Sequence, residues 1–122
     1  MRTFYVKGTI EHMVRRKQSV DVPQMLVDTG REHTWVPTKL LEMIGVKREK
    51  KDLTFEMANG QHITRNIGFA IVRWDGHFTI DEVVFAEEDD LPLLGARSLE
   101  GMNLTVDSRR KKLVAAGPIP AA

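Results

Sequence analysis

An aspartate stands directly after two apolar residues and directly before a threonine and a glycine, in the segment Leu26-Val27-Asp28-Thr29-Gly30. This order indicates a strand that carries a carboxylate out of a buried element and into a turn. Gly30 allows the backbone to turn tightly beside the carboxylate, and the hydroxyl of Thr29 can fasten the turn by hydrogen bonding. A carboxylate held in this way suits general acid–base chemistry, so we expect Asp28, Thr29 and Gly30 to form a catalytic segment.

One carboxylate does half of the work needed to hydrolyse a peptide bond, because one group must activate water while another protonates the carbonyl oxygen. The sequence holds no second Asp-Thr-Gly and no Asp-Ser-Gly. A twofold homodimer would bring two copies of Asp28 to the symmetry axis, where the pair shares one proton and the water between them becomes the nucleophile. The simpler interpretation is an ordinary turn between strands, and it carries equal weight when the tripeptide is taken alone.

Other catalytic and metal-binding chemistries find little support in the residue types. The chain contains no cysteine, which excludes disulfides, thiolate metal sites and thiol nucleophiles. Its four histidines lack the close paired spacing of a metal site, and its serines lack the context of a nucleophile elbow. The acidic segment 87–90 lacks the ligand pattern of a calcium loop. We therefore expect no metal site.

Charge and hydropathy argue against a nucleic acid or a membrane as the partner. The formal net charge is +1 and the pI is about 8.1, so acidic and basic residues nearly cancel. Basic runs at residues 15–17, 47–51 and 109–112 fall at expected turns and connectors, where solvated charge is the simpler interpretation. No run is long enough to span a bilayer, and the first residues lack the apolar core of a signal peptide. We expect a soluble, cytoplasmic protein, and a basic β-barrel that binds nucleic acid is the weaker alternative.

β-forming residues dominate the chain, and turn signals recur at intervals of roughly 8–12 residues, as is typical of an all-β domain. Asn59-Gly60 and Asp75-Gly76 mark two hairpin turns. The expected strands cover residues 3–12, 17–27, 53–57, 61–73, 78–85, 103–106 and 112–115.

One or two short helices are expected beside the strands. Pro37 suits the first turn of a helix, and Leu40, Leu41 and Ile44 supply one apolar face. A single helical turn is expected over residues 96–100, and residues 47–52 are expected to form a charged connector. Since no linker or repeat is visible, we expect one domain over residues 1–116, followed by a flexible tail over residues 117–122.

Four features, taken in chain order, resemble the retropepsin family of single-domain aspartic proteases, which includes the retroviral enzymes. They are Leu26-Val27-Asp28-Thr29-Gly30, Thr34-Trp35-Val36-Pro37, the hairpin Met57-Ala58-Asn59-Gly60-Gln61, and Leu93-Leu94-Gly95 followed by a short helix. The resemblance covers nearly the whole chain, roughly residues 6–114. As a set, these features are far more specific than the tripeptide alone.

The resemblance implies a closed, barrel-like all-β fold in which the hairpin forms a flap over an extended peptide or protein substrate. It also implies an aspartic endopeptidase that is active as an obligate homodimer, with one Asp28 from each chain and no cofactor. Glu32 stands where viral relatives carry an acidic residue that holds the substrate backbone. The flap turn of the family corresponds here to Ala58, Asn59 and Gly60.

Arg31 follows Gly30 at a position where the family usually has alanine or serine. Its long cationic side chain could act on the aspartates, crowd the substrate or point outward, and we place it with Glu32 among the substrate-binding residues. Two interpretations therefore stay open. One is a homodimeric aspartic endopeptidase, and the other is a catalytically silent module of the same fold that binds a peptide or protein while Arg31 disables the carboxylate pair.

Overall fold

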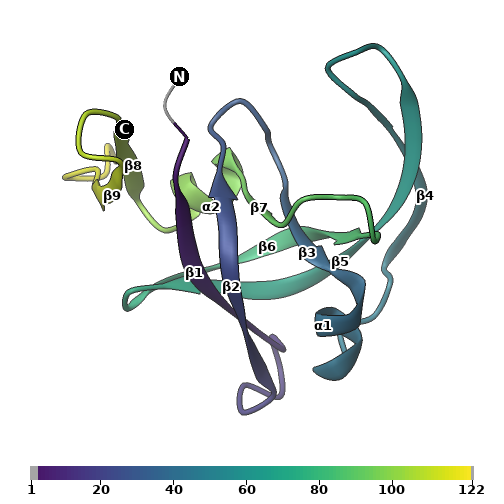
Figure 1. The fold of residues 1–122 in the computed structure, drawn as a ribbon. Helices are drawn as coiled ribbons and strands as arrows, with labels where there is room; N and C mark the ends of the chain where they lie inside the picture. Colours follow the sequence, from purple (N-terminus) through teal and green to yellow (C-terminus); the bar gives the residue numbers. More distant parts are fainter. Residues whose placement is uncertain (1–2, 122) are drawn as a thin grey trace.

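Seven strands form one sheet that curves round and meets itself (Figure 1). The computed structural model describes residues 3–121. The sheet order is β1-β2-β7-β3-β6-β5-β4, and β1 pairs with β5 as well as with β2, so the sheet is ring-like. The strands are β1 (Tyr5–Glu11), β2 (Ser19–Val27), β3 (Thr34–Pro37), β4 (Lys50–Glu56), β5 (His62–Trp74), β6 (His77–Ala86) and β7 (Leu93–Leu94).

The remaining elements are small. Two helices, α1 (Thr38–Met43) and α2 (Ala96–Gly101), lie beside the ring, and β8 (Leu104–Asp107) and β9 (Lys112–Ala115) form a separate hairpin. The prediction of an all-β domain with short helices is confirmed. Within residues 3–121, no helix has the length and apolar character needed to cross a membrane.

The tail predicted over residues 117–122 is described as far as residue 121. It forms no helix or strand up to that point. The side-chain amide of Asn103 donates a hydrogen bond of 2.8 Å to the carbonyl of Gly117, which holds the start of the tail against the end of α2. The flexibility of this segment stays a prediction.

Both predicted hairpin turns are present, with different backbone geometry. Asp75 and Gly76, between β5 and β6, have φ angles of 45° and 81°, the left-handed pair that a two-residue hairpin turn requires. The turn between β4 and β5 is wider. There the N–H of Met57 donates to the carbonyl of Gln61 (2.7 Å), and Gly60 alone is left-handed, with a φ angle of 86°. We call the β4–β5 hairpin the arm.

Three segments differ from their prediction. Pro37 is the N-cap of α1 and so precedes the first helical turn instead of lying in it, and it is also the last residue of β3, where it pairs with β6 opposite Ala86. β4 begins at Lys50, inside the segment predicted as a connector, because a register shift occurs before Leu53. At this shift Asp52 has a φ angle of 55°, and its N–H binds a side chain of β5. β7 was not predicted as a strand, since two residues are too few to show alternation.

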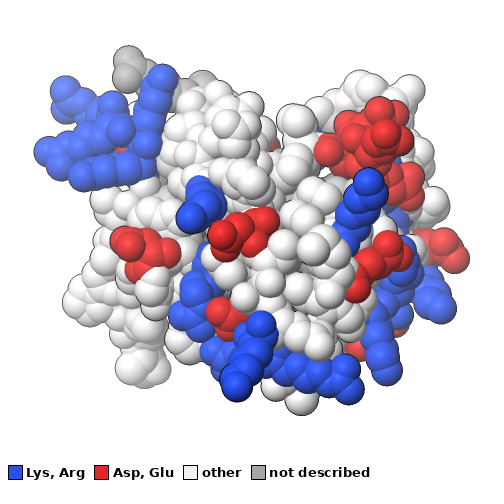
Figure 2. Space-filling model, turned by 60° about the horizontal axis from the view of Figure 1, so that its bottom comes forward, with Lys and Arg blue, Asp and Glu red and all other residues white. Residues whose placement is uncertain are grey.

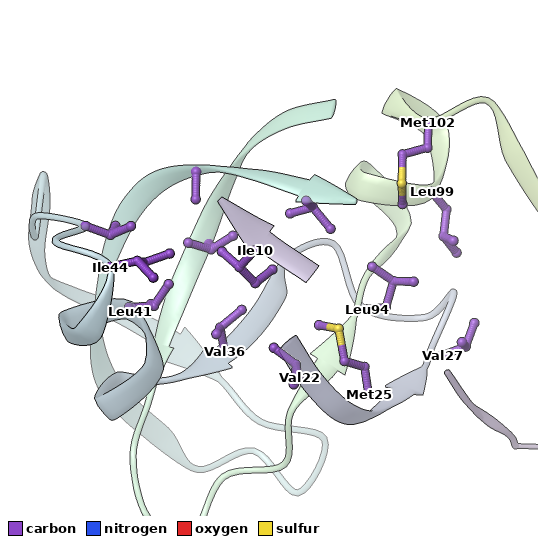
Figure 3. Close-up of a cluster of buried hydrophobic side chains, with 14 of the residues drawn as sticks. Ile10, Val22, Met25, Val27, Val36, Leu41, Ile44, Leu94, Leu99 and Met102 are labelled. Atoms are coloured by element: carbon purple, nitrogen blue, oxygen red, sulfur yellow. The ribbon is translucent and has the colours of Figure 1, made fainter. Parts of the chain in front are cut away.

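The core fills the inside of the ring with aliphatic side chains from many elements (Figure 3). Alternating residues of the strands point inward, and α1 and α2 each add a leucine, Leu41 and Leu99. A second, smaller cluster lies on the side of the arm. It consists of Trp35, Ile67, Val84, Ala86 and Leu93, with Phe55 and Ile63 of the arm packed against it. The two clusters fix both sides of β3, which follows the Asp28 loop.

The surface mixes both signs of charge on the face drawn in Figure 2, apart from a group of basic side chains at its upper left. The β8–β9 turn carries four consecutive exposed cations, residues 109–112. Among the described residues, these cations have one ion pair, in which Arg110 Nε lies 3.8 Å from Asp107 Oδ2. The turn is therefore a solvated basic corner.

The ring closes where β1 meets β5, and a partly buried ion pair links the two strands there. Arg73 Nε donates to Glu11 Oε2 at 2.7 Å, and the side chain of Glu11 is 12% exposed. The hydrogen bond from Arg73 lowers the pKa of Glu11 most, Arg16 lowers it further, and partial burial opposes both. The ion pair therefore stabilises the fold at neutral pH.

We expect Glu11→Gln to lower the free energy of unfolding by about 1–2 kcal/mol near neutral pH. Because the pKa of Glu11 is lowered in the folded chain, its contribution is present above the unfolded pKa of about 4.3 and is lost as the pH falls through the folded pKa. Urea unfolding near pH 7 and near pH 3 measures this difference, which should shrink in acid. Glu42→Gln, which breaks an exposed ion pair with Arg48, is the control. A loss that is equal at both pH values would contradict the assignment.

Candidate active site

The loop that carries Asp28 joins β2 to β3, and β7 lies between these two strands. β7 runs parallel to β2, with Leu26 opposite Leu93, and antiparallel to β3, with Trp35 opposite Leu93. The backbone N–H of Asp28 donates a hydrogen bond of 3.1 Å to the carbonyl of Leu94. The place of Asp28 is therefore fixed by a strand from much later in the chain.

Within this loop, the carboxylate of Asp28 binds its own backbone. Asp28 Oδ1 accepts a hydrogen bond of 2.9 Å from the N–H of Gly30, and the carbonyl of Asp28 accepts one of 3.3 Å from Arg31. Asp28 is half-buried, whereas Thr29 and Gly30 are exposed. The carboxylate thus fastens the turn, a role predicted for Thr29, whose hydroxyl makes no hydrogen bond within residues 3–121. Asp28 Oδ2 makes no hydrogen bond within residues 3–121 and lies 3.8 Å from Arg31 Nε.

The start of α2 supports the loop from behind. The carbonyl of Arg31 accepts a hydrogen bond of 2.7 Å from the N–H of Ala96, and the carbonyl of Glu32 accepts one of 3.0 Å from Arg97. Gly95 passes so close to the loop that a Cβ atom there would collide with the backbone carbonyl of His33. Only glycine fits at this position, which gives a physical reason for the Leu-Leu-Gly order that precedes the helix.

A chain of buried hydroxyls lies beneath the loop, and sequence reasoning missed it. Ser98 Oγ donates to Asp81 Oδ2 at 2.7 Å, so its lone pair is free to accept from Thr34 Oγ1 at 2.6 Å. Thr34 Oγ1 in turn accepts the N–H of Gly95 at 3.1 Å. Thr34 and Ser98 are fully buried. The sequence signal is weak, because nothing in the sequence distinguishes Ser98 or Asp81 from exposed polar residues.

Two hollows flank the Asp28 loop. The first, of about 260 Å³, is lined by Gly30, Glu32, His33, Phe55 and Glu56 as well as the shared residues below, and we call it the arm hollow. The second, of about 240 Å³, contains Asp28, Leu26, Asp89, Asp90, Leu91 and Leu93, and we call it the loop hollow. Arg31, Trp35 and Met57 line both of them. A peptide lying across Asp28 would therefore pass from one hollow to the other.

A larger hollow of about 710 Å³ lies on the other side of the acidic segment 87–90 and contains no residue of the Asp28 loop. Its lining mixes cations such as Lys39 and Arg48 with anions such as Glu87 and Glu88. Volume alone would favour this hollow, but its carboxylates lie on the acidic segment 87–90 and it does not contain Asp28. The two smaller hollows are the better candidate because they hold Asp28.

An ion pair between Arg65 of the arm and Asp90 holds the wall of the loop hollow. Arg65 Nε and Nη2 donate to the two carboxylate oxygens of Asp90 at 2.7 and 3.0 Å, and both side chains are nearly buried. Burial raises the pKa of Asp90, but the hydrogen bonds from Arg65 and from the N–H of Glu87 outweigh it, so the pKa is lowered. Asp90 is therefore a structural anion at neutral pH.

The structure brings together most of the residues predicted for the site. Asp28, Thr29 and Gly30 share one loop with Arg31 and Glu32, and four of these five line a hollow. The exposed arm tip, residues 58–60, lines neither hollow, and Met57 beside it lines both. Trp35 and Phe55 are further lining residues that the prediction left out; their rings meet edge to face at 5.4 Å.

Comparison with known proteins finds no match: no family model fits the chain, and no curated protein is similar to it at a significant level. The function must be argued from the geometry of the site.

We expect Ser98→Ala to lower the free energy of unfolding by about 1–3 kcal/mol, because Asp81 loses a donor and Thr34 loses an acceptor where water is excluded. Urea unfolding measures the change. Ser108→Ala, in the exposed β8–β9 turn, is the matched control and should stay within about 0.5 kcal/mol of the parent. Equal effects of the two substitutions would show that the buried hydroxyl chain contributes nothing.

Proposed function

We propose that this chain is one half of a homodimeric aspartic endopeptidase with a retropepsin-like fold. The observation that carries the proposal is the setting of Asp28. Its Oδ1 accepts a hydrogen bond from the N–H of Gly30, its Oδ2 makes no hydrogen bond within residues 3–121, and the loop is exposed at Thr29 and Gly30. A carboxylate so held can meet a second copy of itself across a twofold axis.

The order of the elements around Asp28 supports the same proposal. The loop is followed by β3, β7 is inserted between β2 and β3, and Gly95 leads into a short helix behind the loop. Three of the four segments that resemble retropepsins, 26–30, 34–37 and 93–95, are therefore neighbours in space, and the fourth, 57–61, reaches the hollows beside them through Met57. This arrangement supports the proposal.

The substrate that fits the cleft is an extended peptide. The arm and the Asp28 loop border the arm hollow, and the loop hollow continues past Asp28 toward Leu91. Within the described residues β4 pairs with β5 alone, so its other edge offers free backbone groups to a peptide strand. Alternate side chains of such a peptide would enter hollows lined by Trp35 and Met57. Glu32 remains a candidate for holding the peptide backbone.

The chemistry of the proposed dimer needs no group beyond the two carboxylates and water. Two Asp28 side chains at hydrogen-bonding distance hold one proton between them, because both cannot be ionised at once. The ionised carboxylate takes a proton from water as its oxygen attacks the peptide carbon, and the protonated carboxyl gives its proton to the carbonyl oxygen. The resulting gem-diol collapses when a proton reaches the amide nitrogen and the C–N bond breaks.

One observation favours a second candidate, a silent peptide-binding module. Arg31 Nε lies 3.8 Å from Asp28 Oδ2, so the carboxylate already has a cationic neighbour within its own chain. If this neighbour prevented the two carboxylates from sharing a proton, the cleft would bind a peptide without cutting it. Cleavage by the wild type separates the two candidates.

We expect Asp28→Asn to lower kcat/KM by about 10³-fold or more on a peptide library, because the amide cannot accept a proton from water. Mass spectrometry of the products measures the cleavage, and light scattering checks that the variant remains a dimer. Asp75→Asn, in the exposed β5–β6 turn, removes the same charge far from the site and should cleave like the wild type. Equal cleavage by the wild type and Asp28→Asn would end the protease proposal, as would the absence of cleavage by both.

The dimer makes a separate prediction for mixtures of wild type and Asp28→Asn. If one active site needs an Asp28 from each chain, an equal mixture that has exchanged subunits should retain about one quarter of the activity of the same total amount of wild type. Chains that act alone would retain about one half. A titration of the mixing ratio distinguishes a quadratic from a linear dependence. Mixtures with Asp75→Asn should lose nothing.

A further inference from the structure

Arg31 is clamped at its backbone on both sides. Its N–H donates to the carbonyl of Asp28 (3.3 Å), and its carbonyl accepts from the N–H of Ala96 (2.7 Å). The backbone of Arg31 is therefore held by two hydrogen bonds. The side chain is 39% exposed and runs back toward the carboxylate, with Nε 3.8 Å from Asp28 Oδ2. It does not point outward, one of the directions that the sequence left open.

The two oxygens of Asp28 differ in what they contact. Oδ1 is taken by the N–H of Gly30, whereas Oδ2 has no hydrogen bond within residues 3–121 and faces Arg31. Oδ2 is thus the oxygen left to hold water or a proton in the proposed reaction. A water or carbonyl oxygen bonded to Oδ2 would lie within reach of the Arg31 guanidinium, whose N–H groups make no hydrogen bond inside the described chain.

Arg31 also lies where a substrate must pass. It lines both the arm hollow and the loop hollow, and no other lysine or arginine lines either of them in the part of the chain that the structure describes. Its acidic neighbour at 3.8 Å is Asp28. Of the other carboxylates that line these hollows, Asp90 is paired with Arg65, and those of Glu32, Glu56 and Asp89 belong to exposed residues. Arg31 is therefore the one fixed cation beside the bond that would be cut.

We propose that Arg31 is a further catalytic residue, which donates a hydrogen bond to the substrate carbonyl oxygen and stabilises the negative charge that builds on it in the transition state, before the partner carboxyl has delivered its proton. This inference rests on the proposed function. The proton balance of the reaction is unchanged, since water gives its proton to the ionised Asp28, the partner carboxyl gives its own to the carbonyl oxygen, and Arg31 keeps all of its protons. The cation stabilises the charge while these protons move, as preorganised donors do in other active sites.

The plainer interpretation is a turn in which an arginine pairs with the aspartate three residues earlier and does nothing else. The chain contains such a pair at Asp107 and Arg110 in the β8–β9 turn, with the same spacing and the same separation of 3.8 Å. That pair lies outside both hollows. Arg110 is therefore a matched control for the loss of an arginine from an Asp-x-x-Arg turn.

The experiment compares the wild type with Arg31→Met, Arg31→Gln, Arg31→Lys and Arg110→Met, first on the peptide library and then on one peptide that is cleaved. We expect the two neutral variants to lose about 10- to 100-fold in kcat, with KM changed by less than about threefold, because the interaction is made mainly in the transition state. Lysine, which restores the charge but not the guanidinium fork, should recover part of kcat. Arg110→Met should match the wild type. Urea unfolding and light scattering check that all variants fold and dimerise.

Each outcome decides the inference. A fall in kcat for both neutral variants, with partial recovery by lysine, supports it. Unchanged kcat in Arg31→Met and Arg31→Gln overturns it while the protease proposal stands, provided that Asp28→Asn is inactive. A rise in kcat, or cleavage by the neutral variants alone, overturns it and identifies Arg31 as the residue that disables the carboxylate pair. If the wild type and every Arg31 variant cleave nothing, the proposed function fails and the inference fails with it.

Discussion

The hydrogen bond from the backbone of Asp28 to the carbonyl of Leu94 joins two distant parts of the chain, and the site depends on the strand that makes it. β2 and β3 separate on either side of the Asp28 loop, so their facing backbone groups would lack partners without a strand between them. β7 supplies those partners with only two residues. The approach to β7 is made by Pro92, whose carbonyl accepts from the N–H of Leu26, and the exit is made by Gly95, which alone can pass beneath the loop. The carboxylate is therefore positioned by backbone contacts that no single local segment could provide.

The two hollows beside Asp28 are bordered by the arm and by the acidic segment 87–90, and both of these are connected to β7. The acidic segment 87–90 leads directly into β7, and Asp90 in this segment binds Arg65 at the base of the arm. Movement of the arm would therefore displace the acidic segment and, through it, β7, which positions Asp28. Beneath the loop, the hydroxyl chain from Asp81 through Ser98 to Thr34 connects β6, α2 and β3. A rigid base and a linked pair of walls are what a site needs when small displacements of the reacting groups slow the reaction strongly.

Local patterns in the sequence predicted the long elements well. β5 and β6 carry enough alternating apolar residues to reveal a strand, and Asp75-Gly76 has the conformational freedom that their turn requires. β7 could not be predicted, because its two leucines are extended only through their pairing with β2 and β3 on either side. The start of β4 was missed for a related reason. Its charged residues read as a connector, and only the side chain of Asn66 in the next strand supports the unusual backbone at Asp52.

In the candidate site, too, the features set by local sequence could be predicted and those set by distant contacts could not. Asp28 and its turn could be predicted because chemistry and backbone geometry both act within three residues. The direction of the Arg31 side chain could not be predicted, since the backbone that carries this side chain is held by a hydrogen bond from Ala96. The hydroxyl chain was hidden because Thr34, Asp81 and Ser98 are ordinary residues until the fold buries them together. In each case the missing information is a contact between segments far apart in the chain.

The buried polar side chains and the sheet find their partners within the described chain. Among residues 3–121, no buried side-chain nitrogen or oxygen lacks a hydrogen-bond partner, and the ring of strands closes within one chain. The case for a dimer rests on the proposed chemistry, in which water attack on a peptide bond uses a second carboxyl group. If activity requires two chains, it is governed by their association. Its control would then lie in protein concentration as much as in the site itself.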